Sequence, residues 1–273
     1  GSVLLGLSIV AGKTSYRLGV PTLILFVIVG MLAGSEGIGK INFNNPGVTR
    51  FIGIIALNFI LFSGGLETRW EVIKPVFWHG LTLSTLGVFL TALSVGVFVW
   101  AVTDFTIYEG LLLGAIVSST DAAAVFSILR SKNLGLKKNI RASLELESGS
   151  NDPMAYFLTI AVMGLMLSKD QSALSIIPLF IKQVIIGGAV GLIAGRLGKE
   201  LINRIELDFM GLYPVIVISL MFFTFSFTDF IGGNGFLAVY LSAVYLGNQY
   251  LIHKKTIMQV FDGLAWLMQI VLF

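Results

Sequence analysis

The 273-residue sequence contains no cysteine, which excludes disulfide bonds and thiolate metal sites. Charged residues make up only 12% of it, whereas an average soluble domain carries roughly 25%. Phosphate-binding glycine loops, zinc-ligand spacings and nucleophile elbows are also missing. What the sequence has instead is 56% hydrophobic residues, gathered in repeated long runs. This composition indicates a polytopic membrane protein rather than a large soluble domain.

Ten apolar runs are near the roughly 20 residues that a helix needs to cross a bilayer. They are too long and too continuous for barrel strands, and backbone exposed to lipid must satisfy its own hydrogen bonds, so the runs are predicted to be helices. The expected fold is therefore an all-α bundle with about ten transmembrane helices. Their predicted spans are 2–12, 18–34, 48–66, 79–102, 108–129, 144–168, 174–197, 209–228, 235–250 and 257–273.

The basic residues alternate between the two sides of this bundle. Loops that carry most lysines and arginines face the cytoplasm, so the beginning of the chain is predicted to lie outside the cell. The net charge of +3 is explained by these loops, and nucleic-acid binding is not expected. The residues assigned to the cytoplasmic side are Lys13, Arg17, Arg69, Lys74, Arg130, Lys132, Lys137, Lys138, Arg141, Arg196, Lys199, Arg204, Lys254 and Lys255, and those on the opposite side are Lys40, Arg50, Lys169 and Lys182.

Two aspartates lie within apolar runs, where a carboxylate is costly and usually marks an ion or proton pathway. Asp121 is nine residues from Arg130, and Asp152 is eleven from Arg141. At about 1.5 Å per residue these separations are about 13 and 16 Å, which places both carboxylates near the middle of the roughly 30 Å hydrocarbon core. Their helices are consecutive and antiparallel, so we expect them to be neighbours in space.

The first aspartate follows a cluster of hydroxyl residues, Ser118-Ser119-Thr120. These side chains compete for backbone hydrogen bonds, and the cluster is predicted to interrupt the helix, with Asp121 capping a half-helix over 122–129. Broken helices of this kind form ion sites in transporters. The alternative interpretation is a polar helix-packing patch, because serine and threonine are frequent at such interfaces.

The second aspartate lies in LELESGSNDPMAYFLT, directly before Pro153. Asp152 as the N-cap of a helix starting at Pro153 is the simplest alternative. That helix would span only about 24 Å, so a start near Leu144 with a buried Asp152 is preferred. Ser148 then shares a helical face with Asp152, and Glu147 shares one with Asn151. Together with the Thr120 region, Ser148 and Asp152 offer oxygen ligands for Na⁺ or K⁺, and a buried aspartate can also carry a proton.

Two other acidic residues, Glu147 and Glu67, are further candidates for the ion pathway. Glu147 lies inside the membrane nearer the cytoplasm and needs a partner, because a buried charge is costly when unpaired. Glu67 ends an apolar run beside Arg69, where an interfacial charge and a ligand role are both open.

At SSTDAAAVFSIL and LELESGSNDPMAYFLT the sequence resembles the monovalent cation:proton antiporter-1 family, and within it the NhaP-type and CvrA-type bacterial potassium/proton antiporters. AGKTSYRLGVPTLILFVIVGMLAG and LFSGGLE fit the same family. The resemblance implies an NhaA/NhaP-like fold with inverted repeats and broken helices, and elevator-like alternating access. It further implies panel helices for dimerisation over 1–78, an ion-binding core over 79–168, a linker helix over 174–204, second panel helices over 209–273, and a second core half beyond 273.

The resemblance also assigns roles to individual residues. Asp152 is the expected exchange carboxylate, and Asn151 stands where electrogenic relatives carry a second aspartate, which implies electroneutral exchange. Asp121 and Thr120 are expected at the broken-helix crossover, with Asn151, Ser148 and Glu67 as further ion-binding residues. Glu147 matches a position that pairs with an arginine on a later helix. A K⁺ or Na⁺ ion as cargo is expected at Asp152, Asp121 and Ser148.

The predicted function is a transporter rather than an enzyme, exchanging K⁺ or Na⁺ for H⁺ across a bacterial inner membrane. The alternatives are a Na⁺/H⁺ antiporter of the same family, a cation channel, and an intramembrane aspartyl protease that uses Asp121 and Asp152 for acid–base catalysis. No cofactor is expected, and the expected partners are membrane lipid and a second copy of the chain. The short first run, Gly1-Ser2 and the apolar end at Phe273 suggest part of a longer protein, which allows for a C-terminal cytosolic regulatory domain.

Overall fold

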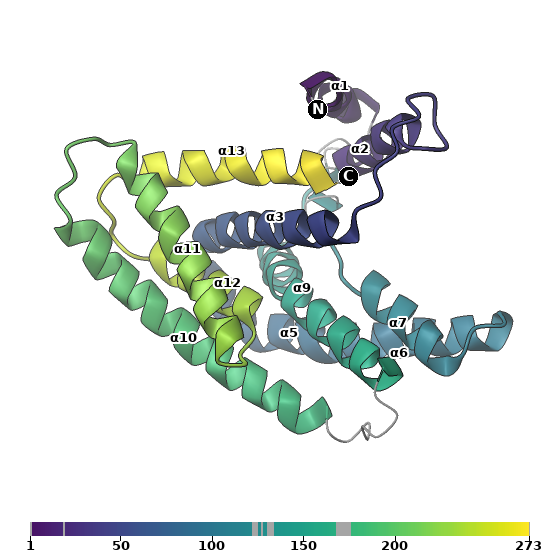
Figure 1. Ribbon diagram of the computed structural model, residues 1–273. Helices are drawn as coiled ribbons and strands as arrows, with labels where there is room; N and C mark the ends of the chain where they lie inside the picture. Colours follow the sequence, from purple (N-terminus) through teal and green to yellow (C-terminus); the bar gives the residue numbers. More distant parts are fainter. Residues whose placement is uncertain are drawn as a thin grey trace.

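The computed structural model describes residues 2–18, 20–121, 125–126, 128–129, 134–167 and 176–272. Within these ranges every regular element is helical, as the apolar runs predict, and each predicted run contains at least one helix (Figure 1). The helices are α1 (Ser2–Leu18), α2 (Thr22–Ala33), α3 (Pro46–Glu67), α4 (Trp70–Ile73), η1 (Lys74–Val76), α5 (Phe77–Thr82), η2 (Leu83–Gly87), α6 (Val88–Val102), α7 (Ile107–Val117), α9 (Lys138–Leu167), α10 (Ile176–Arg204), α11 (Leu212–Phe230), α12 (Gly235–Gly247) and α13 (Lys254–Leu272).

Several helices extend beyond their predicted bounds. Trp70–Val102 forms one helical stretch of 33 residues, which begins nine residues before the predicted 79 and passes through a 3-10 turn at Pro75 and a π-helical turn at η2. Helix α9 begins at Lys138 rather than 144, and α10 continues to Arg204 rather than 197. Hydropathy marks only the apolar part of a helix, whereas pairs such as Arg141–Glu145, 2.9 Å apart at i and i+4, keep its polar end helical.

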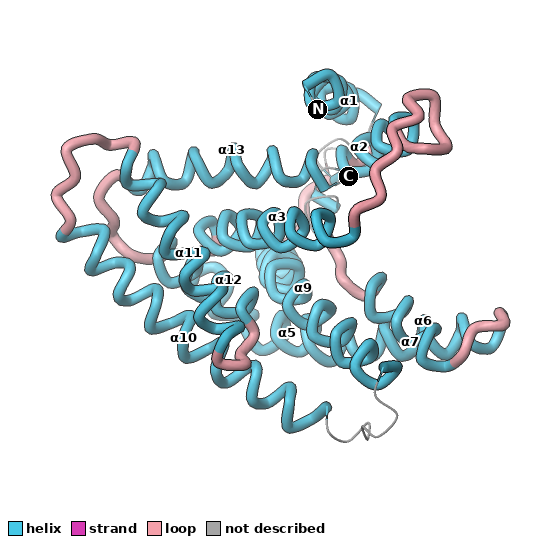
Figure 2. The backbone as a smooth tube through the Cα atoms, in the orientation of Figure 1, coloured by secondary structure: helices cyan, strands magenta, loops and turns pink. Residues whose placement is uncertain are grey.

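Four helical stretches in the described residues are long and apolar enough to cross a membrane by themselves. They are Pro46–Glu67, Trp70–Val102, Ile176–Arg204 and Leu212–Phe230. Shorter apolar helices accompany them at Ser2–Lys13, Thr22–Ala33, Ile107–Val117 and Gly235–Gly247. Short loops join most of these helices (Figure 2).

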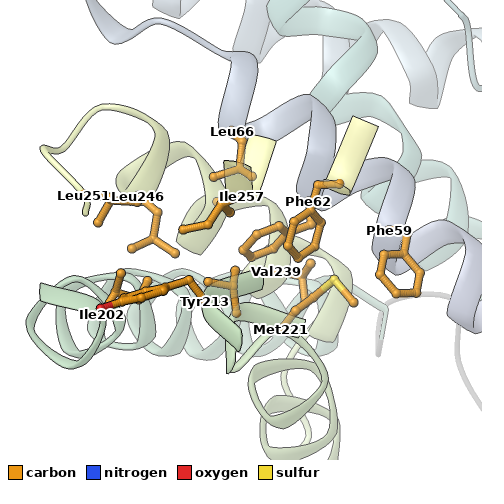
Figure 3. Close-up of a cluster of buried hydrophobic side chains, with 13 residues drawn as sticks. Phe59, Phe62, Leu66, Ile202, Tyr213, Met221, Val239, Leu246, Leu251 and Ile257 are labelled. Carbon is orange, nitrogen blue, oxygen red and sulfur yellow. The ribbon is translucent and has the colours of Figure 1, made fainter. Parts of the chain in front are cut away.

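A large hydrophobic cluster joins α3 to α10, α11, α12 and α13. Its centre contains aromatic side chains, among them Phe62 (Figure 3). The rings of Phe62 and Phe261 lie 4.7 Å apart and are tilted against each other, and both residues are fully buried. Met221 and Val239 fill the space beside them at 0% exposure. In Figure 1, α13 runs beside α3, and α10, α11 and α12 gather at one end of this pair. These helices form one packing unit, because they share one continuous buried core.

A second and smaller cluster joins α6, α7 and α9. It is built from residues such as Val88, Ala92, Ala115 and Phe157, against which Phe180 of α10 also packs. Helices α6 and α7 touch closely, because a β-carbon on Gly114 would lie only 2.1 Å from the carbonyl oxygen of Ala92. The helix that carries Asp152 therefore belongs to this smaller cluster and also contacts α3 and α12 of the larger one.

Glycines on α10 permit a second close approach. A β-carbon on Gly187 would lie 2.7 Å from the carbonyl oxygen of Asn234, and one on Gly191 would lie 2.6 Å from that of Ala238. Gly195 faces Tyr245 in the same way. The repeated glycines of α10 thus serve packing against α12 within this chain.

Candidate functional site

The hydroxyl cluster ends helix α7, as the sequence predicts. The helix stops at Val117, and at this end the hydroxyl of Ser118 donates to the carbonyl oxygen of Ala115 at 2.7 Å. Residues 119–121 are non-helical, whereas 125–126 and 128–129 are helical again. The predicted half-helix over 122–129 therefore falls partly outside the described residues. The non-helical segment of three polar residues, 119–121, lies beside α9.

Helix α9 runs without interruption from Lys138 to Leu167, with Pro153 inside it. Asp152 is therefore an interior helical residue and not an N-cap, in agreement with the length argument. Asn151 is fully buried, whereas Glu147, Ser148 and Asp152 are half-buried. These polar side chains project from one stretch of α9 toward the broken end of α7.

The hydroxyl of Ser119 donates a short hydrogen bond to Oδ1 of Asp152. The same hydroxyl lies 3.5 Å from Oδ1 of Asn151. Ser119 is a contact of the acidic side chain that the sequence prediction did not single out, although it belongs to the predicted hydroxyl cluster. The signal for it was present: once the helix breaks at Ser118, the next residue is the first one free to reach across to the neighbouring helix.

Thr120 connects the broken segment to Glu147. Its hydroxyl donates to Oε1 and Oε2 of Glu147 at 2.8 and 3.0 Å. The hydroxyl of Ser148 donates to the Thr120 carbonyl oxygen at 3.2 Å. The carbonyl group of Thr120 lies outside any helix and in this conformation accepts from Ser148 and Asn151. Carbonyl groups of broken helices hold cations in transporters.

The side chain of Asn151 links these groups. Its Nδ2 donates to the carbonyl and hydroxyl oxygens of Thr120, at 3.0 and 2.6 Å, and to Oε1 of Glu147 at 3.0 Å. An amide N–H is a donor and does not coordinate a cation. In this conformation Asn151 therefore bridges the broken segment and α9, with only its Oδ1 placed as a potential ligand.

The two remaining predicted acids, Asp121 and Glu67, are both exposed. Asp121 is exposed at the end of the broken segment, within electrostatic range of Asp152, as Glu147 also is. Glu67 is exposed at the end of α3, and its acidic neighbours are Asp262 and Glu145. The structure thus brings together Ser148, Thr120, Asn151, Asp152 and Glu147, with Asp121 close by, and leaves Glu67 outside their hydrogen-bond network in the described residues.

This constellation offers a weak, oxygen-rich site. Among the described residues, no three histidine, aspartate or glutamate side chains are grouped to hold a metal ion. The site presents the carboxylates of Asp152 and Glu147, hydroxyl groups and a non-helical carbonyl group, and such oxygen atoms are ligands for hard cations. A broken helix beside a carboxylate-bearing helix, inside an apolar bundle, is the arrangement found in secondary transporters of the membrane.

The chain belongs to the sodium/hydrogen exchanger family. The profile of that family, described as "Sodium/hydrogen exchanger, transmembrane", matches residues 3–273. The K(+)/H(+) antiporter NhaP of Alkalimonas amylolytica is 45% identical over 271 residues, which cover 99% of this chain and 47% of that protein. The K(+)/H(+) antiporter NhaP2 of Shewanella sp. strain MR-4 is 39% identical over 275 residues, covering 100% and 47%. The chain therefore spans about half the length of these relatives.

The fold has a solved counterpart. The sodium proton antiporter MjNhaP1 from Methanocaldococcus jannaschii at pH 8 superposes with a TM-score of 0.82 at 24% identity, covering 97% of this chain and 66% of that one. This likeness confirms the predicted antiporter fold. The aspartyl protease alternative finds no support, because these relatives are named as ion antiporters.

Proposed function

We propose that this chain forms the exchange site of a cation/proton antiporter that moves K⁺ against H⁺, with both ions competing for Asp152. The observation that carries the proposal is the contact between Asp152, inside α9, and the broken end of α7 through Ser119. Oδ1 of Asp152 is occupied by that hydroxyl, whereas Oδ2 accepts no hydrogen bond from the described residues. Oδ2 is therefore the oxygen at which a proton or a cation binds.

Competition at one carboxylate couples the two ions. A protonated or cation-loaded Asp152 is neutral, whereas an empty carboxylate carries a charge that is expensive to move through an apolar environment. The loaded forms cross the membrane and the empty form stays, so each proton is exchanged for a cation. The hydroxyl of Ser148, the Thr120 carbonyl oxygen and the nearby Asp121 supply the remaining oxygen ligands of the cargo ion, and Glu67 joins them only if α3 approaches.

K⁺ is preferred as the cargo because the relatives at 45% and 39% identity are named K(+)/H(+) antiporters. Na⁺ is the second candidate, since the matched archaeal structure at 24% identity is that of a sodium proton antiporter. Both ions take oxygen ligands, and the described site contains no feature that rejects either one.

Exchange is electroneutral in this proposal. Asn151 supplies an amide where a second carboxylate would add a charge, and its Nδ2 contacts hold the broken segment without titrating. Glu147 is bonded by Thr120 and Asn151, and its charge partner is proposed to be an arginine on a later helix.

The two hydrophobic clusters support the division of an elevator-like transporter into a moving core and a dimerisation panel. The small cluster of α6, α7 and α9 lies within the proposed core, 79–168, and carries the site. The large cluster contains α3 and α11–α13, from the proposed panels at 1–78 and 209–273, together with α10 from the linker helix at 174–204. We further propose a homodimer in the inner membrane of a bacterium, surrounded by lipid.

The experiment is cation-dependent proton flux through the full-length protein in proteoliposomes, titrated separately with K⁺ and Na⁺. Asp152→Asn keeps the shape of the side chain but cannot exchange a proton, so it is expected to abolish flux while the protein remains folded. Asp208→Asn, in the loop between α10 and α11, is the matched control. Retained flux in Asp152→Asn refutes the proposal, and cation conductance without proton movement indicates a channel instead.

A further inference from the structure

The face of α9 that turns away from the broken helix packs against α12. Three residues of α9 at spacings of four and three carry this contact, namely Gly149, Pro153 and Tyr156. A β-carbon on Gly149 would lie 2.8 Å from the hydroxyl oxygen of Tyr240, and the rings of Tyr156 and Phe236 meet edge to face at 4.8 Å. Because α9 lies in the small cluster and α12 in the large one, this contact is one of the places where the two packing units meet.

One polar side chain spans this contact. Asn234, which is 7% exposed, donates from Nδ2 to the carbonyl oxygen of Pro153 at 3.2 Å. Its Oδ1 at the same time accepts from the backbone N–H of Leu237 at 3.0 Å and so caps the first turn of α12. The backbone of Asn234 is fixed as well, because its N–H donates to the carbonyl oxygen of Gln183 in α10 at 3.1 Å.

The hydroxyl group of Tyr240 is the neighbouring polar group at this contact. The hydroxyl of Tyr240 is buried and has no hydrogen-bond partner among the described residues. Asn234 therefore provides a side-chain hydrogen bond between α9 and the start of α12, and its acceptor is the carbonyl group of Pro153, the residue that follows Asp152.

We propose that Asn234 is a positioning residue for Asp152. By holding the Pro153 carbonyl group against the start of α12, it sets the height of the exchange carboxylate relative to the large packing unit in this conformation. A side chain that only capped α12 would be replaceable by any other good N-cap. A positioning role requires the N–H donor in addition, and this difference can be measured. The inference rests on the proposed function of Asp152.

Two substitutions separate the roles. Asn234→Asp is nearly isosteric and caps a helix as well as asparagine does, but it places a carboxylate oxygen against the Pro153 carbonyl oxygen. Asn234→Ser also caps and adds no charge, but it is too short to reach Pro153. Asn45, the N-cap of α3 with Oδ1 3.1 Å from the N–H of Val48, provides the matched pair Asn45→Asp and Asn45→Ser, because it is exposed and lies outside the site.

The measurement is proton flux against K⁺ concentration for the full-length protein in proteoliposomes. Asn234→Ser is expected to raise the apparent KM for K⁺ by about fivefold, the effect of losing one hydrogen bond of about 1 kcal/mol. Asn234→Asp is expected to raise it further, and the maximal rate is expected to stay unchanged in both variants. Both Asn45 variants are expected to match the wild type. A folded Asn234→Ser protein with wild-type KM overturns the proposal, as does failure of both Asn234 variants to fold. If only Asn234→Asp misfolds, the serine variant decides.

Deuterium exchange of the α9 amides after Pro153 provides a readout that needs no transport. These amides are expected to exchange faster in Asn234→Ser than in Asn45→Ser. If the wild-type protein shows no cation-dependent proton flux, the proposed function fails, and this measurement alone decides whether Asn234 positions α9. Equal exchange in the two variants then overturns the positioning role.

Discussion

Replacing Thr120 with valine tests the contact that holds the broken segment to α9. The Thr120 hydroxyl donates to both carboxylate oxygens of Glu147 and accepts from Nδ2 of Asn151 at 2.6 Å. Valine has almost the same shape and volume but no hydroxyl group. The substitution therefore removes these bonds and leaves the packing nearly unchanged.

The magnitude follows from the geometry. The hydroxyl has one proton shared between two oxygens, so it counts as a single hydrogen bond to a charged group, worth about 1.5–3 kcal/mol. Thr120 is exposed on this chain, and solvent weakens such contacts, so we expect the lower end, a loss of about 1.5 kcal/mol in the free energy of unfolding. That loss lowers the Tm by about 3–6 °C in a protein of 150–250 residues and by less in the longer full-length protein.

The assay combines thermal unfolding of the purified full-length protein with proton flux in proteoliposomes. Thr120→Val is expected to lower both the Tm and the flux, and Thr120→Ser, which restores the hydroxyl, is expected to recover both. Thr159→Val is the control, because among the described residues the Thr159 hydroxyl bonds only to the Ala155 carbonyl oxygen of its own helix, at 2.8 Å. The reasoning is refuted if Thr120→Val unfolds and transports like the wild type, or if Thr159→Val loses as much.

Two further predictions concern packing and helix ends. Gly191→Ala is expected to lower the Tm, because its β-carbon would lie 2.6 Å from the Ala238 carbonyl oxygen and overpacking costs about 1–3 kcal/mol. Gly188→Ala, on the same helix with open space around it, is expected to raise the Tm slightly, and the reverse order in a thermal melt would contradict the close packing of α10 on α12. Lys254→Met is expected to cost about 1 kcal/mol in the free energy of unfolding, because the ammonium group of Lys254 donates to two carbonyl groups at the C-terminal end of α12. Lys255→Met, measured by the same melt, should cost less, and equal losses would argue against this cap.

Much of the site was predictable from the order of the residues, because it is built from local chemistry. Hydroxyl residues before Asp121 predicted the helix break that ends α7 at Val117. The spacing of Glu147 and Asn151 predicted a shared face, and the two side chains are hydrogen-bonded at 3.0 Å. The contact from Ser119 to Asp152 was not predicted, because it depends on the course of the chain after the break.

The contacts of the other predicted residues required the assembled bundle. The sequence offered Asn151 as a ligand, but only the packing of α7 against α9 directs its Nδ2 to Thr120 and Glu147. Glu67 shares the apolar setting of the other acids, yet α3 packs against α12 and α13, which places its carboxylate beside Asp262. Helix ends such as Lys138 were missed because polar residues continue a helix without any hydropathic signal.

The sequence by itself determined the helices and singled out Asp121 and Asp152, because a bilayer admits only long apolar runs whose backbone groups are bonded internally, and a charge within such a run is conspicuous. The tertiary structure alone decided which side chains meet. The pairing of the broken segment with α9, and the tie from Asn234 to the carbonyl group next to Asp152, join residues that are 33 and 81 positions apart. Such contacts follow from how helices pack on one another, and no periodicity within a single helix encodes that arrangement.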